Sequence, residues 1–350
     1  MSEGIVRLAE ALDDQDMIGH TRSFVEDIEN GLDIMKRNLL PWMNYVAETQ
    51  WQGVLCLGMR GSGAGGDFLS ILCDHFGTLP VKTSRSYEIP AWWNKQHLII
   101  ATSHSGNTEE TINAVENAAR DGGTVIVISS GGVLAGLSEL YEDVHLISSP
   151  GGQPPRTAFG HLFSRQLALL NQLDILPDLI DDAMISRLKS ANEECDIINE
   201  PEGAIPSLAL SLMDHQIALL GPDELNPALV RMKNQLNENS ARFARIGVIP
   251  EMNHNEIVGW TNSNQNMIPV LIRIKDESEE IKNRFEALKN TVWKNTSIEE
   301  IFLKSQHNLS KIIEGIFIGD MVSIRLAKRN NIDPTPVKVI EKLKIALDGK

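Results

Sequence analysis

Apolar residues recur at helical spacing through the first fifty residues of the chain, as in Phe24, Ile28 and Leu32. The positions between them are polar or charged, so one face of each predicted helix can pack while the other meets water. The pattern predicts a helical lead-in over residues 1–50 that packs on the domains that follow it.

From residue 51 the pattern changes to short apolar runs separated by helix-like segments. The runs expected to form strands are 53–57, 81–83, 97–102, 124–129 and 144–147. Helices are expected between some of them, at about 66–76 and 108–119. Strands that alternate with helices favour a mainly parallel sheet with helices on both faces. We therefore expect one α/β domain over residues 51–191.

A second unit of the same kind is expected after an acidic, poorly apolar stretch, Asn192 to Gly203, which is typical of a linker. Its expected strands are 216–220, 267–274 and 300–303. Its expected helices are 207–213, one that starts at Pro227, 279–289, 309–329 and a last one from Asp333 to about Leu347. Each half leads from a short helix into a strand and a glycine turn, which indicates a pseudo-repeat. The predicted fold class is α/β, with two doubly wound domains, 51–191 and 192–350, after the lead-in.

Composition narrows the classes of protein that this chain can be. With 350 residues, 42% of them hydrophobic and 23% charged, it suits two globular domains. An excess of 47 acidic over 32 basic residues gives a formal net charge of −15, which opposes binding to nucleic acid or to an anionic membrane. Three cysteines are too few for a disulfide framework, and neither a leader peptide nor a membrane-length apolar run is evident. We expect a cytoplasmic protein with buried thiols.

The hydroxyl-bearing residues Ser103, Ser105 and Thr108 stand between a predicted buried strand and a predicted helix. Their hydroxyls, the exposed backbone N–H groups and the positive end of the helix dipole converge on a small volume, which indicates an anion site. A phosphate group is the expected ligand. His104 lies among them and is expected to pack rather than to act in catalysis.

A glycine-rich segment, Gly58 to Asp67, follows the first predicted strand and allows the backbone to approach a ligand closely. Its Gly61, Gly63 and Gly66 match the dinucleotide-binding fingerprint, so a nicotinamide- or flavin-dependent enzyme is one alternative. The region about twenty residues further on lacks a clean ribose-binding acid, which opposes that alternative. A tight turn that binds nothing is the other.

The segment from Ser103 to Glu109 reads Ser-x-Ser-Gly-x-Thr-Glu and resembles the phosphosugar loop of the sugar isomerase (SIS) domain. The segments 151–156, 233–240, 250–260 and 333–336 resemble the signature of the bifunctional phosphoglucose/phosphomannose isomerases. The resemblance covers nearly the whole chain after the first dozen or so residues. It implies two SIS domains, a homodimer with its active site near the interface, and an aldose–ketose isomerase of glycolysis and gluconeogenesis that needs neither a cofactor nor a metal.

Isomerisation of a phosphosugar needs an anion site, a group that opens the ring, a base that carries a proton between C1 and C2, and positive charge near the enediolate. The resemblance implies that the phosphosugar is bound by Gly61, Ser62, Ser103, Ser105 and Thr108. It implies that Glu238 is the base and that His254 opens the ring, with the histidine supplied across the dimer interface. Arg156 would stabilise the enediolate.

Taken alone, each of these residues has a plainer interpretation. A glutamate such as Glu238 near the end of a helix is most often solvated surface, although its polar neighbours favour a network. His254 lies in a segment rich in proline and asparagine with no apolar face to pack on, and a histidine that titrates near neutrality suits proton transfer. Arg156 follows two prolines and carries a permanent charge, a surface arginine being the alternative.

The C-terminal segment offers a ring-opening lysine, because Lys342 lies seven positions after Thr335, as the family pattern requires. Lys338 and Lys344 lie nearby and are alternatives, and an ordinary helix-surface lysine is the plainer interpretation of each. Strict phosphoglucose isomerases resemble one another in carrying glutamine where this chain has Thr335. Threonine there implies room for the epimeric C2 hydroxyl of a mannose substrate.

One residue departs from the family pattern, because Arg60 stands where the first glycine loop usually has a glycine. If that position needs a positive φ or a close backbone approach, arginine introduces strain or obstructs the sugar. Alternatively, its guanidinium adds a contact to phosphate or to an acidic residue.

The sequence therefore predicts a cytoplasmic isomerase that interconverts glucose 6-phosphate or mannose 6-phosphate with fructose 6-phosphate. The alternative of a different class is a non-catalytic phosphosugar sensor, which would keep the loop from Ser103 to Thr108 but has no need of Glu238, His254 and Arg156 together. A dinucleotide-dependent oxidoreductase is the third possibility. No nucleic acid, membrane or metal partner is expected.

Overall fold

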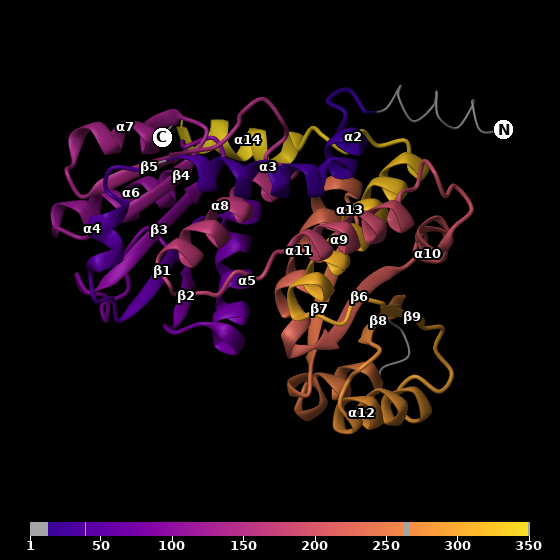
Figure 1. The fold of residues 1–350 in the computed structure, drawn as a ribbon. Coiled ribbons are helices and arrows are strands. Elements are labelled where there is room, and N and C mark those ends of the chain that lie inside the picture. Colours follow the sequence, from indigo (N-terminus) through magenta and orange to yellow (C-terminus); the bar gives the residue numbers. More distant parts are fainter. Residues whose placement is uncertain (1–12, 39, 262–265, 349–350) are drawn as a thin grey trace. The chain divides into compact units, whose positions relative to one another are not determined.

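The computed structural model describes residues 13–38, 40–261 and 266–348 (Figure 1). The chain forms two compact units. The N-terminal unit comprises Ser23–Arg187, and the C-terminal unit combines the described residues up to Arg22 with those from Leu188 onward. The first twelve residues of the predicted lead-in lie outside the described residues.

Arg22 explains why the beginning of the described chain belongs to the C-terminal unit. Its Nε lies 2.9 Å from Oδ2 of Asp196, and its carbonyl accepts a hydrogen bond from Nδ2 of Asn192 at 2.7 Å. The predicted helical lead-in is therefore divided. Helix α2 (Met17–Arg22) contacts α13 of the C-terminal unit, whereas α3 (Phe24–Arg37) packs along α8 of the N-terminal unit.

The N-terminal unit is built on a five-stranded sheet with the order β2-β1-β3-β4-β5, in which every pair is parallel. Its strands are β1 Gly53–Leu57, β2 Val81–Ser84, β3 His97–Ser103, β4 Val125–Ser129 and β5 Val144–Ser148. Its remaining helices are α4 Met43–Glu48, α5 Arg60–Phe76, α6 Glu109–Arg120, α7 Gly132–Leu140 and α8 Phe159–Gln172. The strands β1 and β4 are buried along their whole length, because helices cover both faces.

Two apolar layers hold this sheet. On one face, α6 and α7 contribute Ala114, Val115, Leu134 and Leu137 to a core shared with the strands. On the other face, the layer formed by α3, α5 and α8 contains four packed phenylalanines, with 5.2 Å between the ring centroids of Phe159 and Phe163. Figure 1 shows the sheet between these two helical layers.

The C-terminal unit has a four-stranded, all-parallel sheet with the order β7-β6-β8-β9. Its strands are β6 Gln216–Pro222, β7 Ala244–Ile249, β8 Met267–Ile274 and β9 Glu299–Leu303. Its helices are α9 Asp182–Cys195, which begins just before the unit does, α10 Ala204–Ser211, α11 Asn226–Ser240, α12 Glu279–Asn290, α13 Asn308–Arg329 and α14 Lys338–Asp348. Three short 3₁₀ helices are η1 Asp223–Leu225, η2 Glu251–His254 and η3 Glu256–Thr261.

The two sheets follow one plan. The order β2-β1-β3-β4 in the first corresponds to β7-β6-β8-β9 in the second, where the described residues form no counterpart of β5. This confirms the predicted fold class, two doubly wound α/β domains with helical segments at the start.

Several elements differ from the sequence-based expectation. The helices α7 and α9 and the strand β7 were not predicted, and β7 carries polar positions because it lies at the edge of its sheet. The last helix begins at Lys338 rather than near Asp333, because the Asp333 carboxylate accepts a hydrogen bond from the backbone N–H of Thr335 at 2.9 Å and holds a turn there.

Helix α5 begins at Arg60, so most of the glycine-rich segment is helical rather than a loop. A Cβ atom at Gly66 would lie 2.6 Å from Cys56 Cβ and from Thr83 Oγ1, and one at Gly63 would lie 2.3 Å from the carbonyl oxygen of Gly58. Gly66 therefore lets α5 pack directly on β1 and β2, and Gly63 lets the start of α5 approach the backbone that follows β1. Close packing therefore explains why glycine stands at these two positions of the dinucleotide fingerprint.

Arg60 has a φ of +50°, which is the left-handed conformation that the family glycine would adopt without strain, and its side chain is exposed. Replacing Arg60 by glycine is expected to raise the free energy of unfolding by about 0.5–1 kcal/mol, because a left-handed L-residue costs about 1–2 kcal/mol and the entropy of glycine offsets part of the gain. Chemical denaturation measures this change.

The matched control is Ala241→Gly, because Ala241 is also exposed and has a φ of +51°. Both variants should gain stability in the same direction. A stabilised Ala241→Gly beside a destabilised Arg60→Gly would contradict the prediction.

Candidate active site

The phosphate loop, residues 103–108, joins the end of β3 to the start of α6. Ser103 is buried, and its Oγ lies 2.9 Å from Oγ1 of Thr108. Ser105 is exposed, and its Oγ accepts a hydrogen bond from the N–H of Asn107 at 3.3 Å. The loop therefore gathers three hydroxyls at the N-terminus of α6, which is the arrangement that the sequence predicts for an anion site.

The neighbouring loop between β4 and α7 braces the phosphate loop. A Cβ atom at Gly106, which has a φ of +67°, would lie only 1.7 Å from the carbonyl oxygen of Gly131. The N–H of Leu134 donates to the carbonyl of Gly106 at 3.0 Å, and Oγ of Ser130 donates to the carbonyl of His104 at 2.6 Å. Only glycine fits at position 106.

Ser62 lies against the phosphate loop, because its Oγ accepts a hydrogen bond from the backbone N–H of His104 at 3.2 Å. It belongs to the first turn of α5, as does Gly61. The structure thus brings the first turn of α5 together with the loop after β3, at the carboxyl ends of two adjacent strands.

His104 connects the phosphate loop to a second segment, the arginine loop, residues 151–156. Its Nε2 donates to the carbonyl oxygen of Gln153 at 3.1 Å. Burial lowers the pKa of His104, so its imidazole is neutral at neutral pH, and the carbonyl acceptor places the proton on Nε2. The expectation that His104 packs agrees with its exposure of 6%.

Arg156 ends the arginine loop and is only 8% exposed, so the interpretation as a surface arginine is wrong. The turn that holds it is closed by Thr157, whose N–H and Oγ1 both donate to the carbonyl of Pro154, at 2.9 and 2.8 Å. A permanent charge is thereby fixed in the same unit as the phosphate loop.

A buried acid, which sequence reasoning missed, lies behind the arginine loop. Asp27 of α3 is 7% exposed, and its Oδ1 lies 3.2 Å from Nε2 of His161 on α8. Burial raises the pKa of Asp27 to about 7, against the opposing effects of the Gln153 side chain as a hydrogen-bond donor and of the charge of Arg165. The sequence did hold a signal, since Asp27 interrupts the apolar stripe of a helix.

In the C-terminal unit, Glu238 is half-buried on α11. Its helix is joined to α13 by a polar seam in which the Asp320 carboxylate accepts from Arg231 at 2.8 Å and from Gln235 at 2.9 Å. Nδ2 of Asn239 donates to Oγ of Ser323 at 2.9 Å. The polar network expected around Glu238 therefore exists in its neighbours, and it fixes α11 against a buried helix.

His254 is the last residue of η2, and its side chain is exposed. The surrounding segment is anchored at other positions: Met252 is buried in the core, and Asn253 accepts a hydrogen bond from Arg284 at 3.4 Å. Glu256 pairs with Arg245 and accepts from Nε1 of Trp260 at 3.2 Å. This anchoring presents His254 at the surface of the unit.

Glu238 and His254 lie toward opposite ends of β7. The end of α11 is tied to the start of the strand, because the N–H of Ala244 donates to Oδ1 of Asn237 at 3.1 Å. His254 follows the other end of the strand, at Ile249. Six extended residues span roughly 17 Å, so the segments that carry the two side chains join β7 at well-separated points.

The last two predicted positions lie near the C-terminus. Thr335 is 9% exposed in the turn before α14. Lys338, Lys342 and Lys344 all lie on α14, and all are exposed.

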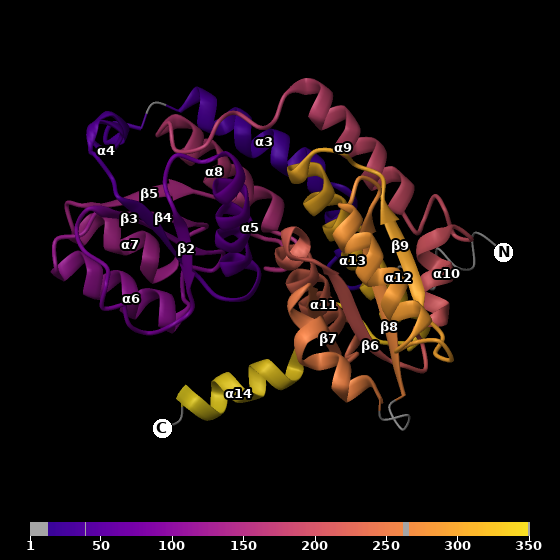
Figure 2. The ribbon, with the colours of Figure 1, turned by 90° about the horizontal axis from the view of Figure 1, so that it is seen from below.

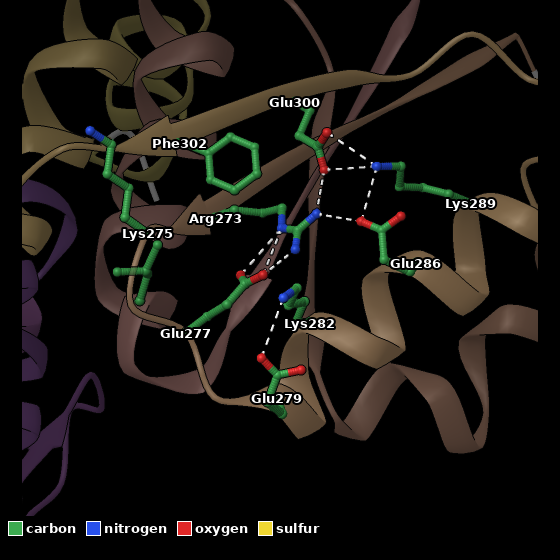
Figure 3. A pocket seen from close by; sticks show the side chains of 10 residues that line it. Arg273, Lys275, Glu277, Glu279, Lys282, Glu286, Lys289, Glu300 and Phe302 are labelled. Carbon is green, nitrogen blue, oxygen red and sulfur yellow. Dashed lines mark hydrogen bonds and ion pairs between the residues drawn. The ribbon is translucent and has the colours of Figure 1, made fainter.

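A cavity of about 330 Å³ lies in the C-terminal unit, and none of the predicted site residues lines it (Figure 3). At its centre Arg273 of β8 pairs with Glu277, with Glu286 at 2.8 Å and with Glu300 at 2.7 Å. Strand β8 corresponds to β3, the strand that carries the phosphate loop. In the second sheet this edge is thus filled by an internally neutralised cluster instead of hydroxyl donors.

In the part of the chain that the structure describes, no cluster of histidine, cysteine and acidic side chains could hold a metal ion, and no helix is long and apolar enough to cross a membrane. The three cysteines are buried and free, as expected. Burial raises the pKa of Cys73 and of Cys195 to about 12, which makes them poor nucleophiles.

Comparison with known families identifies both units as SIS domains. The SIS domain family matches residues 49–173, and the bacterial phospho-glucose isomerase C-terminal SIS domain matches residues 204–347. The fold is similar to that of a hypothetical protein from Thermus thermophilus, with a TM-score of 0.73 and 15% identity over 99% of this chain and 93% of that one.

Comparison with curated proteins shows which family of SIS-domain proteins the chain belongs to. A bifunctional phosphoglucose/phosphomannose isomerase from Caldicellulosiruptor bescii is 31% identical over 83% of this chain and 88% of its own length, and one from Aquifex aeolicus is 30% identical over 88% and 94%. A D-glucosamine-6-phosphate 4-epimerase from Sulfolobus acidocaldarius is 29% identical over 82% and 86%. The chain belongs to the bifunctional phosphoglucose/phosphomannose isomerase family.

Asp27 makes the stability of the protein depend on pH. Because its folded-state pKa of about 7 lies above the unfolded value of 3.8, the folded state holds the proton more tightly, and stability falls as pH rises between these values. Asp27→Asn removes this effect. Its free energy of unfolding relative to wild type should rise by on the order of 2 kcal/mol from pH 5 to pH 8.

Denaturation at several pH values measures this difference. Asp33→Asn, at an exposed position of the same helix, is the control and should give a constant difference. A constant difference for Asp27→Asn as well would contradict the prediction.

Proposed function

We propose that the protein is an aldose–ketose isomerase that interconverts glucose 6-phosphate and mannose 6-phosphate with fructose 6-phosphate. One observation carries the proposal: the phosphate loop and the arginine loop hydrogen-bond to each other through His104 and Gln153. An anion site and a buried permanent charge are thereby held in one unit. Membership of the family supports the same reaction.

The proposed chemistry uses the residues of each unit in turn. The hydroxyls of Ser62, Ser103, Ser105 and Thr108 bind phosphate, together with the N-terminus of α6 and Gly61. His254 and Lys342 transfer the proton that opens the ring. Glu238 then removes the proton from C2 and returns it to C1, and no cofactor is required.

Arg156 stabilises the negative charge of the enediolate that forms between the two proton transfers. A guanidinium remains charged at any pH at which the enzyme works, so it does not compete for the proton that Glu238 carries. The small side chain of Thr335 leaves room beside C2, so that both epimers are substrates.

A homodimer is part of the proposal. The separation of Glu238 and His254 along β7 supports a site that takes the two residues from different chains. Helix α14 supports such an assembly, because Val339 is 79% exposed and Ile345 is 71% exposed, an apolar surface suited to burial by a second copy.

The alternatives are less well supported. A phosphosugar sensor would need the phosphate loop but neither Glu238 nor a buried Arg156. The interpretation as a dinucleotide-dependent oxidoreductase depended on the spacing of three glycines. The close packing of α5 explains two of them, Gly63 and Gly66.

Glu238→Gln should lower kcat by at least about 100-fold, because amide nitrogen cannot accept the C2 proton. Phosphosugar binding, measured by calorimetry, should change little, since the phosphate loop is untouched. Turnover is measured by coupled assays of fructose 6-phosphate formation from glucose 6-phosphate and from mannose 6-phosphate. Asp223→Asn, at an exposed position before α11, is the control.

Absence of turnover by the wild type with either sugar phosphate would contradict the proposed function. D-glucosamine 6-phosphate should be tested in parallel, because a relative is named for epimerising it. Unchanged turnover in Glu238→Gln would remove the residue from the mechanism.

The dimeric site can be tested by mixing two inactive variants, Glu238→Gln and His254→Ala. If each site takes Glu238 from one chain and His254 from the other, random reassociation restores about one quarter of wild-type activity, since half of the dimers are mixed and each has one intact site. Light scattering checks the dimeric mass. No recovery after demonstrated subunit exchange would show that the two residues need not come from different chains.

A further inference from the structure

A chain of buried polar groups runs from α3 to the arginine loop. Asp27 on α3 faces α8, the helix that follows the arginine loop, and the two helices lie side by side (Figures 1 and 2). The carboxylate of Asp27 contacts His161 at 3.2 Å, and the side chain of Gln153 acts on its pKa as a hydrogen-bond donor. The contact with His161 fixes Asp27 against α8, and the interaction with Gln153 links Asp27 to the arginine loop.

The contact between Asp27 and Gln153 is a loose one in this structure. Oδ2 of Asp27 and Nε2 of Gln153 are both buried, and neither makes a hydrogen bond of normal length within the described part of the chain. A buried donor and a buried acceptor without such a bond both carry a desolvation penalty. A small movement of the loop toward α3 would close the bond and satisfy both groups.

Gln153 is linked to both sides of the site. Its side chain faces Asp27, and its carbonyl accepts from Nε2 of His104 at 3.1 Å. It precedes Arg156 by three residues, with Pro154 and Pro155 between them. The two prolines restrict the backbone between Gln153 and Arg156, because their φ angles are fixed.

The charged groups that face Asp27 leave its carboxylate available to Gln153. Glu26 lies on the same helix, and His161 and Arg165 lie on α8. Arg165 is already bonded to backbone carbonyls, with Nε donating to Ser148 and Nη1 to His161, both at 2.8 Å. It therefore acts on Asp27 through its charge.

We propose that Asp27 is a positioning residue for Arg156, holding the arginine loop through Gln153 when its carboxylate is ionised. This inference rests on the proposed isomerase function. In this proposal Asp27 does not touch the substrate. An ionised carboxylate is a strong acceptor for the Gln153 amide, whereas the protonated acid is a weak one, so ionisation tightens the contact and protonation loosens the loop.

The titration of Asp27 gives the proposal its distinctive signature. With the pKa of Asp27 raised to about 7 by burial, its protonation state changes across the neutral range. Asp27→Asn imitates the protonated acid at every pH. The ratio of kcat in this variant to kcat in the wild type should be near unity at pH 5.5 and fall about tenfold by pH 8.5, with a midpoint near 7.

Taking the ratio cancels any pH dependence that the two enzymes share. KM should change less than kcat, because the hydroxyls of the phosphate loop are intact. Asp33→Asn is the control and should give a ratio near unity throughout. A pH-independent ratio for Asp27→Asn, whether near unity or reduced, would overturn the proposal, since a purely structural role lowers activity at every pH.

A second measurement separates this proposal from the proposed function. In ¹⁵N NMR spectra, the ring nitrogens of His104 should report a transition near pH 7 in the wild type, relayed through Gln153, that is absent in Asp27→Asn. If the wild type turns over neither sugar phosphate, the isomerase function fails, and the relay is judged by this spectrum alone. Identical His104 titrations in the two proteins would overturn it.

Discussion

The carbonyl oxygen of Gly131 occupies the space in which any other residue at position 106 would carry its Cβ atom. This one steric requirement allows the loops after β3 and β4 to interlock. The interlock orients the hydroxyls of Ser103 and Thr108, and it places His104 where it can reach the arginine loop. The proposed phosphate site therefore depends on the backbone that holds the hydroxyls as well as on the hydroxyls themselves.

The two sheets share a strand order but use their carboxyl ends differently. In the first, that edge presents hydroxyl donors; in the second, Arg273 is enclosed by three carboxylates (Figure 3). Its Cζ also lies 4.8 Å from the ring centroids of both Phe285 and Phe302. A guanidinium that is already neutralised has little affinity left for a phosphate. Among the described residues, the second sheet therefore has no counterpart of the hydroxyl loop of the first, and the residue proposed as the base, Glu238, lies on a helix of the C-terminal unit.

The sequence predicted the elements whose signal lies in neighbouring residues. It missed those that depend on contacts between residues far apart in the chain. Strand β8 was predicted with its observed bounds, because a continuous apolar run is a local signal. Strand β7 was missed, since an edge strand with Arg245 in it has no such pattern. The phosphate loop was also predicted, because its hydroxyl-bearing residues stand close together in the sequence. Asp27 was missed because its importance comes from contacts with residues more than a hundred positions away, and the spacing along α3 offers only a hint.

The polar seam between α11 and α13 has a consequence for the evolution of this fold. A shift of α11 along α13 by one helical turn would be about 5.4 Å. The pairs of Asp320 with Arg231 and Gln235, and of Ser323 with Asn239, exist in only one register. Substitutions among the apolar residues of α11 therefore need not change its register against α13, because the polar pairs hold that register and with it the position of Glu238, the proposed base.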